Sequence, residues 1–245
     1  MSAGKLDYDY TWIFACAQHA VNVFDIGCNI GNASLIMLLS PSPQSIVLVD
    51  PNPDALSIAA EHLIKNTLSH YARFVCAFVS DKQDEQVAFW TVGAGAAGSM
   101  YSAHAKSASK AQQSTRVSTT TVDALCARFG VTPDLIKVDV EGAERLVLAG
   151  ASACAAQHKT RFFVEVHSNP DLPMVENAEY LLKWCAEHDY AAWYLRDKIR
   201  LTSPDPVADR GRCHWLLQPA SWEFPSWLMP LEQGAPLEKA LAAAS

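Results

Sequence analysis

The sequence predicts an α/β fold in which a parallel sheet is covered by helices. Strand-like and helix-like patterns alternate along the chain, which is typical of such sheets. The chain has 245 residues, 50% of them hydrophobic, which is enough for one domain with a sizeable core. A glycine-bearing turn follows the first predicted strand, in the stretch "VFDIGCNIG" from Val23 to Gly31.

The first half of the chain supplies three strands and two helices. Short runs rich in Val, Ile and Phe, bounded by turn residues, predict strands at 22–26, 45–50 and 73–79. Apolar residues at helical spacing predict helices at 32–40 and 54–66. The chain before them, residues 1–20, is expected to be a helical lead-in.

The middle of the chain departs from this alternation. The run at 86–92 predicts an extra, antiparallel strand. Residues 93–115 are small and polar without a period, so we expect a mobile loop or lid there. A strand at 116–122 and a short helix at 123–130 follow.

The last part returns to the α/β pattern. Strands are expected at 134–140, 160–167, 191–196 and 213–219, and helices at 142–151 and 178–188. No internal repeat is visible, so the whole of residues 1–245 is expected to form one domain. The tail at 230–245 is expected to be weakly ordered.

Composition narrows the class of protein. The net charge is −7 with no basic run, which argues against nucleic-acid binding and against attraction to anionic membranes. No apolar window is long enough for a membrane helix, and Asp7 and Asp9 precede a short apolar stretch unlike a signal peptide. The seven cysteines form no C-x-x-C pair, so we expect reduced thiols in a cytoplasmic protein.

The glycine turn favours a cationic small ligand over a dinucleotide. Gly27 and Gly31 sit where a strand turns into a helix, so a ligand can approach the backbone. The turn lacks the G-x-G-x-x-G fingerprint, since Asn29 stands in place of the second glycine. The carboxylate of Asp25 would repel a pyrophosphate and attract an ammonium or sulfonium group. A plain strand–helix turn without a ligand is the alternative.

A second acid adds the nucleoside half of the ligand. Asp50 ends the second predicted strand about 20 residues after the turn, where an acid accepts hydrogen bonds from ribose hydroxyls in nucleotide-binding α/β folds. The alternative is a turn acid before Pro51 and Pro53. A ligand with a ribose at one end and an amino acid at the other is S-adenosylmethionine.

Several motifs resemble those of one family, the FkbM-type S-adenosylmethionine-dependent methyltransferases. The resemblance runs from about Val21 to His167, and its most specific part is "KVDVEGAE", from Lys137 to Glu144. The motifs, in order, are "VFDIGCNIG", "VDPNP", "VSTTTVDAL", "IKVDVEGAERLVLAGA" and "FFVEVH".

The resemblance implies a class I methyltransferase (Rossmann-like) fold. That fold is a mostly parallel sheet with helices on both faces and one antiparallel strand near the C-terminal edge. It also implies methyl transfer to the oxygen of a hydroxyl on a sugar, a glycan or a natural product. By analogy, the methionyl end of the cofactor would be held by Asp25, Gly27, Asn29 and Gly31, the ribose by Asp50 with Asn52 beside it, and the adenine by Ser80 and Asp81. The family often has Glu where this chain has Asp50.

Ionisable residues gather in two of the predicted strands. The strand period puts Lys137 and Asp139 on one face, with Glu141 joining them if the chain stays extended, and it pairs Glu165 with His167. If the two strands are neighbours, all five groups meet at the carboxyl ends of the sheet, where ligands of open α/β sheets bind. A structural ion pair is the favoured interpretation of Lys137.

Methyl transfer to a hydroxyl needs alignment and removal of a proton. His167 is the preferred base because the usual pKa of histidine is close to neutral. A divalent cation held by Asp139, Glu165 and His167 is an alternative that we do not expect. Two other functions stay open: a nicotinamide-dependent oxidoreductase, which the missing fingerprint disfavours, and a protein that binds S-adenosylmethionine without catalysis.

Overall fold

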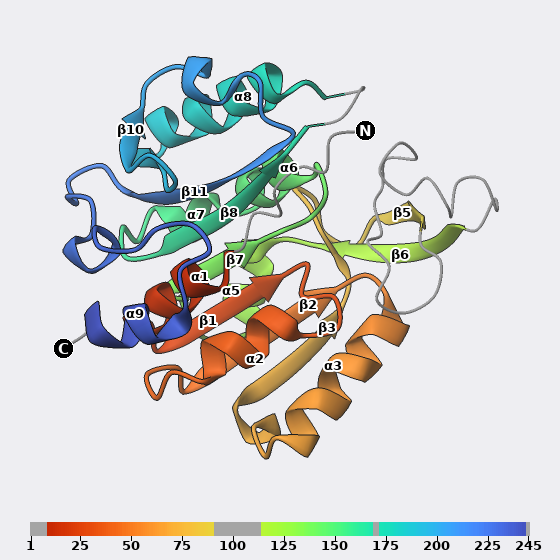
Figure 1. Cartoon of the computed structure of the whole chain (residues 1–245). Helices are drawn as coiled ribbons and strands as arrows, with labels where there is room; N and C mark the ends of the chain where they lie inside the picture. Colours follow the sequence, from red (N-terminus) through yellow and green to blue (C-terminus); the bar gives the residue numbers. More distant parts are fainter. Residues whose placement is uncertain (1–8, 91–113, 169–171, 244–245) are drawn as a thin grey trace, which may run out of the picture.

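A computed structural model describes residues 9–90, 114–168 and 172–243 as a sheet flanked by helices on both faces (Figure 1). Within these residues, eight strands form the large sheet in the order β10-β9-β11-β8-β7-β1-β2-β3. They are β1 (Asn22–Ile26), β2 (Ser45–Asp50), β3 (Ala72–Cys76), β7 (Leu135–Val138), β8 (Arg161–His167), β9 (Tyr190–Tyr194), β10 (Ile199–Leu201) and β11 (Arg212–Pro219).

The strand directions match the predicted sheet. β3, β2, β1, β7 and β8 pair in parallel, and β11 lies antiparallel to both β8 and β9. β11 is therefore the reversed strand expected near the C-terminal edge. β10 is a second reversed strand, antiparallel to β9 at the edge. Its three residues are too few to show a period in the sequence.

A smaller sheet stands beside the carboxyl ends of the large one. It has the order β4-β6-β5, with β4 (Phe78–Val79), β5 (Gln86–Trp90) and β6 (Ser114–Thr120). β5 is antiparallel to β6, which confirms the direction predicted for the extra strand. The predicted strand at 73–79 is divided, because its last residues leave β2 and pair with β6 instead. Of the predicted loop at 93–115, only 114 and 115 are described, and they begin β6.

Helices cover the two faces of the large sheet and bury two apolar clusters. One cluster lies under α1 (Tyr10–Ala17), α2 (Asn32–Leu38), α3 (Pro53–Lys65) and α9 (Leu237–Ala243). The other lies under α5 (Val122–Phe129), α6 (Glu144–Ala149), α7 (Ser152–Ala155) and α8 (Met174–Glu187). Because side chains alternate between the two faces of a strand, β1 contributes to both clusters. Phe24 and Ile26 face the α5–α8 side, and Val23 faces the α1–α3 side.

Local signals explain where helices begin. The side chain of Asn52 accepts hydrogen bonds from the backbone N–H groups of Asp54 (3.1 Å) and Ala55 (3.4 Å), and Pro53 occupies the first turn of α3. The hydroxyl of Thr121 caps α5 by accepting from the N–H of Ala124 at 3.0 Å. Both caps place a strand end against the next helix.

Residues 230–245 differ from the prediction of a weakly ordered tail. The structure forms α9 there, and Leu231 and Ala240 are buried in the same cluster as α1. The hydroxyl of Thr11 in α1 donates to the carbonyl of Ala235. The tail is ordered because its few apolar residues pack against the N-terminal helix. No local sequence pattern predicts a contact between two segments so far apart in the chain.

Gly150, at the joint between α6 and α7, allows a close backbone contact. A Cβ atom added there would lie 2.2 Å from the carbonyl oxygen of Ser80, whereas one added at Gly211 would meet nothing within 4 Å. Contacts of that kind force backbone shifts.

We therefore predict that Gly150→Ala lowers the free energy of unfolding by about 1–3 kcal/mol. Gly211→Ala is the matched control and should stay within about 0.5 kcal/mol of wild type. Chemical denaturation measures both. Equal stabilities for the two variants would contradict the packing described for Gly150.

Candidate functional site

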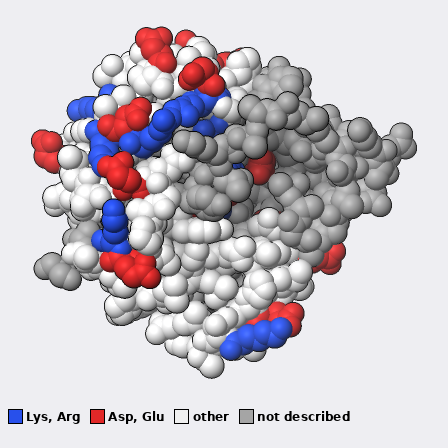
Figure 2. Space-filling view, viewed as in Figure 1, with Lys and Arg blue, Asp and Glu red and all other residues white. Residues whose placement is uncertain are grey.

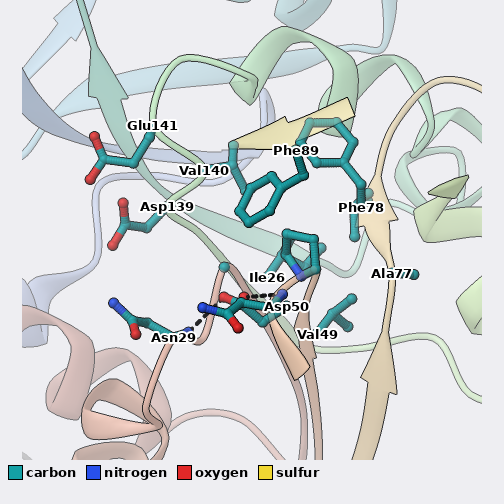
Figure 3. A pocket seen from close by; sticks show the side chains of 14 residues that line it. Ile26, Asn29, Val49, Asp50, Ala77, Phe78, Phe89, Asp139, Val140 and Glu141 are labelled. Atoms are coloured by element: carbon teal, nitrogen blue, oxygen red, sulfur yellow. Dashed lines mark hydrogen bonds between the residues drawn. The ribbon is translucent and has the colours of Figure 1, made fainter. Parts of the chain in front are cut away.

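A cavity opens at the carboxyl ends of β1, β2 and β7, next to the small sheet (Figure 3). In the sheet, β2 lies on one side of β1 and β7 lies on the other. The cavity therefore lies at the point where the order of the strands in the sheet reverses direction. Open α/β sheets bind ligands at this point. The cavity is lined by Ile26, Gly27, Asn29, Val49, Asp50, Pro51, Asn52, Ala77, Phe78, Val79, Phe89, Asp139, Val140 and Glu141.

The glycine turn brings β1 against the end of β7. Gly27, Asn29 and Gly31 have φ values of 74°, 48° and 82°, a left-handed region that favours glycine. A Cβ atom at Gly27 would lie 1.8 Å from the carbonyl oxygen of Asp139, so a larger residue cannot fit there. Of the three, Gly27 and Asn29 line the cavity, whereas Gly31 packs against Ala59 of α3.

Asp50 fixes the turn after β1 to the start of α3. Its two carboxylate oxygens accept hydrogen bonds from the backbone N–H groups of Asn29 (2.8 Å) and Asn52 (2.9 Å), as Figure 3 shows. Burial raises the pKa of Asp50, although these two bonds oppose the shift. All three residues line the cavity. Each oxygen keeps a second lone pair with which to accept from a ligand hydroxyl.

Asp25 lies beneath the cavity and does not line it. Its side chain is fully buried, accepts a hydrogen bond from the hydroxyl of Ser34 at 2.6 Å, and lies 3.3 Å from the ammonium of Lys137. The sequence suggested that this carboxylate meets a cationic ligand. The structure pairs it with a cation of the protein instead, because both residues point to the same face of neighbouring parallel strands.

Lys137 ties three parts of the site together. Its ammonium donates to the carbonyl of Gly27 at 2.9 Å and lies 3.3 Å from both Asp25 and Asp139. Burial disfavours its charge, but Asp139 and Asp25 raise the pKa of Lys137 above its ordinary value. The structural ion pair predicted for Lys137 is present.

The structure brings together the five ionisable residues predicted to meet at this edge. The Nε2 atom of His167 lies 3.4 Å from Glu165, 3.6 Å from Glu141 and 3.9 Å from Asp139. Glu141 does not reach the group through an extended chain, because β7 ends at Val138 and Glu141 has a φ of 51°. A left-handed turn before Gly142 directs it there, and Figure 3 shows it beside Asp139.

Glu144 holds the other side of the imidazole. This fully buried carboxylate lies 2.9 Å from Nδ1 of His167, accepts from the N–H of Gly142 at 2.9 Å, and accepts from the amide of Asn177 at 3.0 Å. Asn177 also donates to the carbonyl of His167 at 2.9 Å. Glu144, the first residue of α6, therefore fixes the orientation of His167.

These contacts set the protonation of the cluster. Burial alone would lower the pKa of His167, but hydrogen bonds to Glu144 and Glu165 raise it well above its ordinary value. Burial raises the pKa of Asp139 to about 6, despite the attraction of Lys137. Near neutral pH, His167 therefore holds a proton, while most Asp139 side chains are ionised and can accept one.

The polar cluster continues past Glu165 to side chains that were not predicted from the sequence. Glu165 lies 2.8 Å from the guanidinium of Arg212 and 3.4 Å from Nε2 of His214, which in turn is 3.8 Å from Asp9. Burial would raise the pKa of Glu165, but the nearby imidazoles of His167 and His214 hold it well below its usual range. The antiparallel register places His214 opposite Glu165, a pairing that only the sheet topology reveals.

The adenine residues predicted by analogy do not line the cavity. The hydroxyl of Ser80 lies 3.0 Å from Asp81, and the carbonyl of Ser80 faces Gly150. Phe78 and Phe89 line the cavity in their place and form one of its walls with Val140 (Figure 3). The alternation of apolar residues in β5 is the signal that could have found Phe89.

Two groups of side chains in the described part of the chain have ligand atoms close enough to hold a metal ion. One is Asp139, Glu141 and His167, and the other is Asp9, Glu165 and His214. The set predicted from the sequence, Asp139, Glu165 and His167, is not one of them. Arg212 already occupies one oxygen of Glu165.

Comparison with known proteins identifies the type of domain. The model of the FkbM methyltransferase domain matches residues 25–191. Among solved structures, an FkbM methyltransferase from Methylobacillus flagellatus shares 16% identity at a TM-score of 0.51, over 81% of this chain and 43% of that one. This chain thus matches less than half of that protein.

A second solved structure has a similar fold. A putative rRNA methylase from Clostridium thermocellum shares 8% identity at a TM-score of 0.52, over 89% of this chain and 99% of that one. Identities this low support the fold alone. No curated protein sequence matches the chain.

The ion pair beneath the cavity gives a prediction about stability. Asp25→Ala leaves the ammonium of Lys137 buried with one carboxylate fewer, so we expect the free energy of unfolding to fall by about 3–5 kcal/mol. Ser34→Ala removes only a neutral donor to the same carboxylate and should lower it by about 1 kcal/mol. Denaturant titration measures both. If Asp25→Ala had wild-type stability but no longer bound the ligand, the result would support the direct contact between Asp25 and the ligand that the sequence suggested.

Proposed function

The chain belongs to the FkbM methyltransferase family, and on that premise we propose that it methylates a hydroxyl oxygen of a sugar, a glycan or a natural product, with S-adenosylmethionine as the methyl donor. The observation that carries this proposal is the cavity at the switch point, with the ionised cluster at its edge. S-adenosylmethionine supplies an activated methyl group on a sulfonium when bound.

The lining residues fit the parts of that cofactor. Asp50 has lone pairs for ribose hydroxyls, and the apolar wall of Phe78 and Phe89 suits a flat base such as adenine. The cluster beyond Lys137 contains more carboxylates than cationic groups, which favours a cationic sulfonium beside Asp139 and Glu141. Gly27 and Asn29 offer backbone to the amino-acid end.

The acceptor is proposed to be rich in hydroxyl groups. At the edge of the cavity, Glu141 and Arg212 are partly exposed and offer a charged acceptor and a charged donor, while Glu165 and His214 are buried behind them. On the face shown in Figure 2, the described Lys and Arg side chains lie beside Asp and Glu and form no broad basic patch. Together with the net charge of −7, this supports a small molecule or glycan over a nucleic acid. No helix of the described residues has the length and apolar character to cross a bilayer.

We assign the base to Asp139. This residue lines the cavity, its side chain is 29% exposed, and its neighbour Lys137 fixes one of its oxygens. The sequence favoured His167, but that imidazole is 6% exposed, and its contacts with Glu144 and Glu165 raise its pKa, which favours a proton on each nitrogen. A protonated imidazole has no lone pair with which to accept a proton. In this proposal His167 balances the charges of Glu141 and Glu165, and Glu144 orients it.

Calorimetry with S-adenosylhomocysteine tests cofactor binding. The wild type should bind it and should not bind NADH, and Asp50→Ala should weaken binding about tenfold or more because a charged acceptor is lost. Asp81→Ala, outside the cavity, is the control and should change the dissociation constant less than about twofold. Binding of NADH in place of S-adenosylhomocysteine would favour an oxidoreductase.

Methyl transfer to a panel of hydroxylated sugars and glycans tests catalysis. Asp139→Asn should lower kcat by about 10²–10⁴-fold with S-adenosylhomocysteine binding retained. Because Asp139 must be ionised to act as a base, wild-type kcat should fall as pH drops through about 6. Wild-type activity of Asp139→Asn would remove this residue as the base.

Two controls separate the alternatives. A chelator is expected to leave the activity unchanged. If a chelator abolished the activity and magnesium restored it, the result would favour a cation at Asp139, Glu141 and His167. Cofactor binding without turnover on any acceptor would favour a protein that binds S-adenosylmethionine without catalysis.

A further inference from the structure

Two cysteines lie together outside the cofactor cavity. Cys126 belongs to α5 and Cys154 to α7. Asp123 joins these helices, because its carboxylate accepts from the backbone N–H groups of Ala153 (2.9 Å) and Cys154 (2.8 Å). Cys126 is one helical turn after Asp123, so its side chain lies over the first turn of α7.

The two thiols share one opening to solvent. Both line a surface cavity separate from the cofactor cavity. Cys126 is half-buried and Cys154 is buried, 3% exposed. Each thiol is a hydrogen-bond partner of the other, and the sulfur of Cys154 also lies 3.4 Å from the hydroxyl of Thr160. The lining residues are Asp123, Cys126, Ala127, Gly130, Val131, Thr132, Ala153, Cys154 and Gln157.

We propose that this cavity is an oxidation site, at which hydrogen peroxide converts the thiols of Cys126 and Cys154 into a disulfide. The pair suits such a bond, because the two thiols are partners of each other and both line one cavity beside a fixed helix–helix contact. Peroxide is small enough to enter the cavity that both cysteines line.

The reaction divides the roles between the two sulfurs. The hydrogen bond from Cys126 lowers the pKa of Cys154, so Cys154 is the thiolate that attacks peroxide. One oxygen is transferred to its sulfur to give a sulfenic acid, and the other leaves as water after gaining a proton. The sulfur of Cys126 then attacks the sulfenic sulfur, the S–O bond breaks, and the oxygen leaves with the Cys126 proton as a second water. Two thiols and one peroxide thus give one disulfide and two waters.

The site borders the wall of the cofactor cavity. The N–H of Asp123 donates to the carbonyl of Gly150 at 3.0 Å, and Gly150 packs against the carbonyl of Ser80, just after β4. A bond between α5 and α7 would therefore fasten the segment that supports β4. The inference about oxidation does not depend on the proposed methyl transfer.

Mass spectrometry of the full-length folded protein tests the proposal. Trypsin places Cys126 in the peptide 117–128, Cys154 in 146–159 and Cys76 in 74–82, each with one cysteine. After hydrogen peroxide and alkylation, we expect 117–128 joined to 146–159, lighter than their sum by two hydrogen atoms and separated again by a thiol reductant. Recovery of the two peptides unlinked, in a sample where Cys76 is oxidised, would overturn the proposal.

Variants test the pairing. Cys126→Ser changes a half-buried side chain by one atom. In this variant the peptide 146–159 should be recovered unlinked, with Cys154 alkylated or oxidised to an acid. Cys76→Ser is the matched control, and it should leave the crosslink at wild-type yield. A crosslink from Cys154 to another cysteine in Cys126→Ser, at the yield seen in wild type, would contradict a specific pair.

Discussion

The buried ammonium of Lys137 is the interaction on which the rest of the site depends. It reaches the carboxylate of Asp25 in β1, the carbonyl of Gly27 in the turn and the carboxylate of Asp139 after β7. One charged group thus fixes both strands that border the switch point. A buried charge is tolerated only when it is paired and hydrogen-bonded, so the three acceptors hold each other in place as much as they hold the lysine.

The cluster beyond Lys137 has a shortage of positive charge. Asp139, Glu141, Glu144 and Glu165 surround His167, and Arg212 reaches only Glu165. The carboxylates raise the pKa of His167 against the effect of its burial, and burial, with Glu165 and Glu141 adding to it, raises the pKa of Asp139. The same shortage favours a cationic ligand in the cavity. Electrostatics thus joins the cofactor proposed for this site to the residue proposed as its base.

The fold surrounds this polar cluster with rigid supports. Glu144 and Asn177 anchor His167 from α6 and α8, and Asp50 anchors the turn after β1 from the end of β2. These anchors lie on regular elements, whereas Asn29 and Glu141, both with positive φ, present their side chains from turns. Strained turns on fixed supports are common where a protein positions groups against a ligand.

The sequence by itself determined the α/β alternation, most of the strands and helices, the glycine turn and the family, because these follow from local periodicity and short motifs. The five ionisable residues meet because β7 and β8 are neighbours and a left-handed turn brings in Glu141. Tertiary structure alone decided which acids face the cavity. Asp25 and Asp50 both occur at strand ends, yet Lys137 from the neighbouring strand takes the first and leaves the second on the cavity wall. Arg212 and His214 joined Glu165 through antiparallel register, and α9 was ordered by α1. Those outcomes depend on contacts between residues far apart in the chain, which no local pattern records.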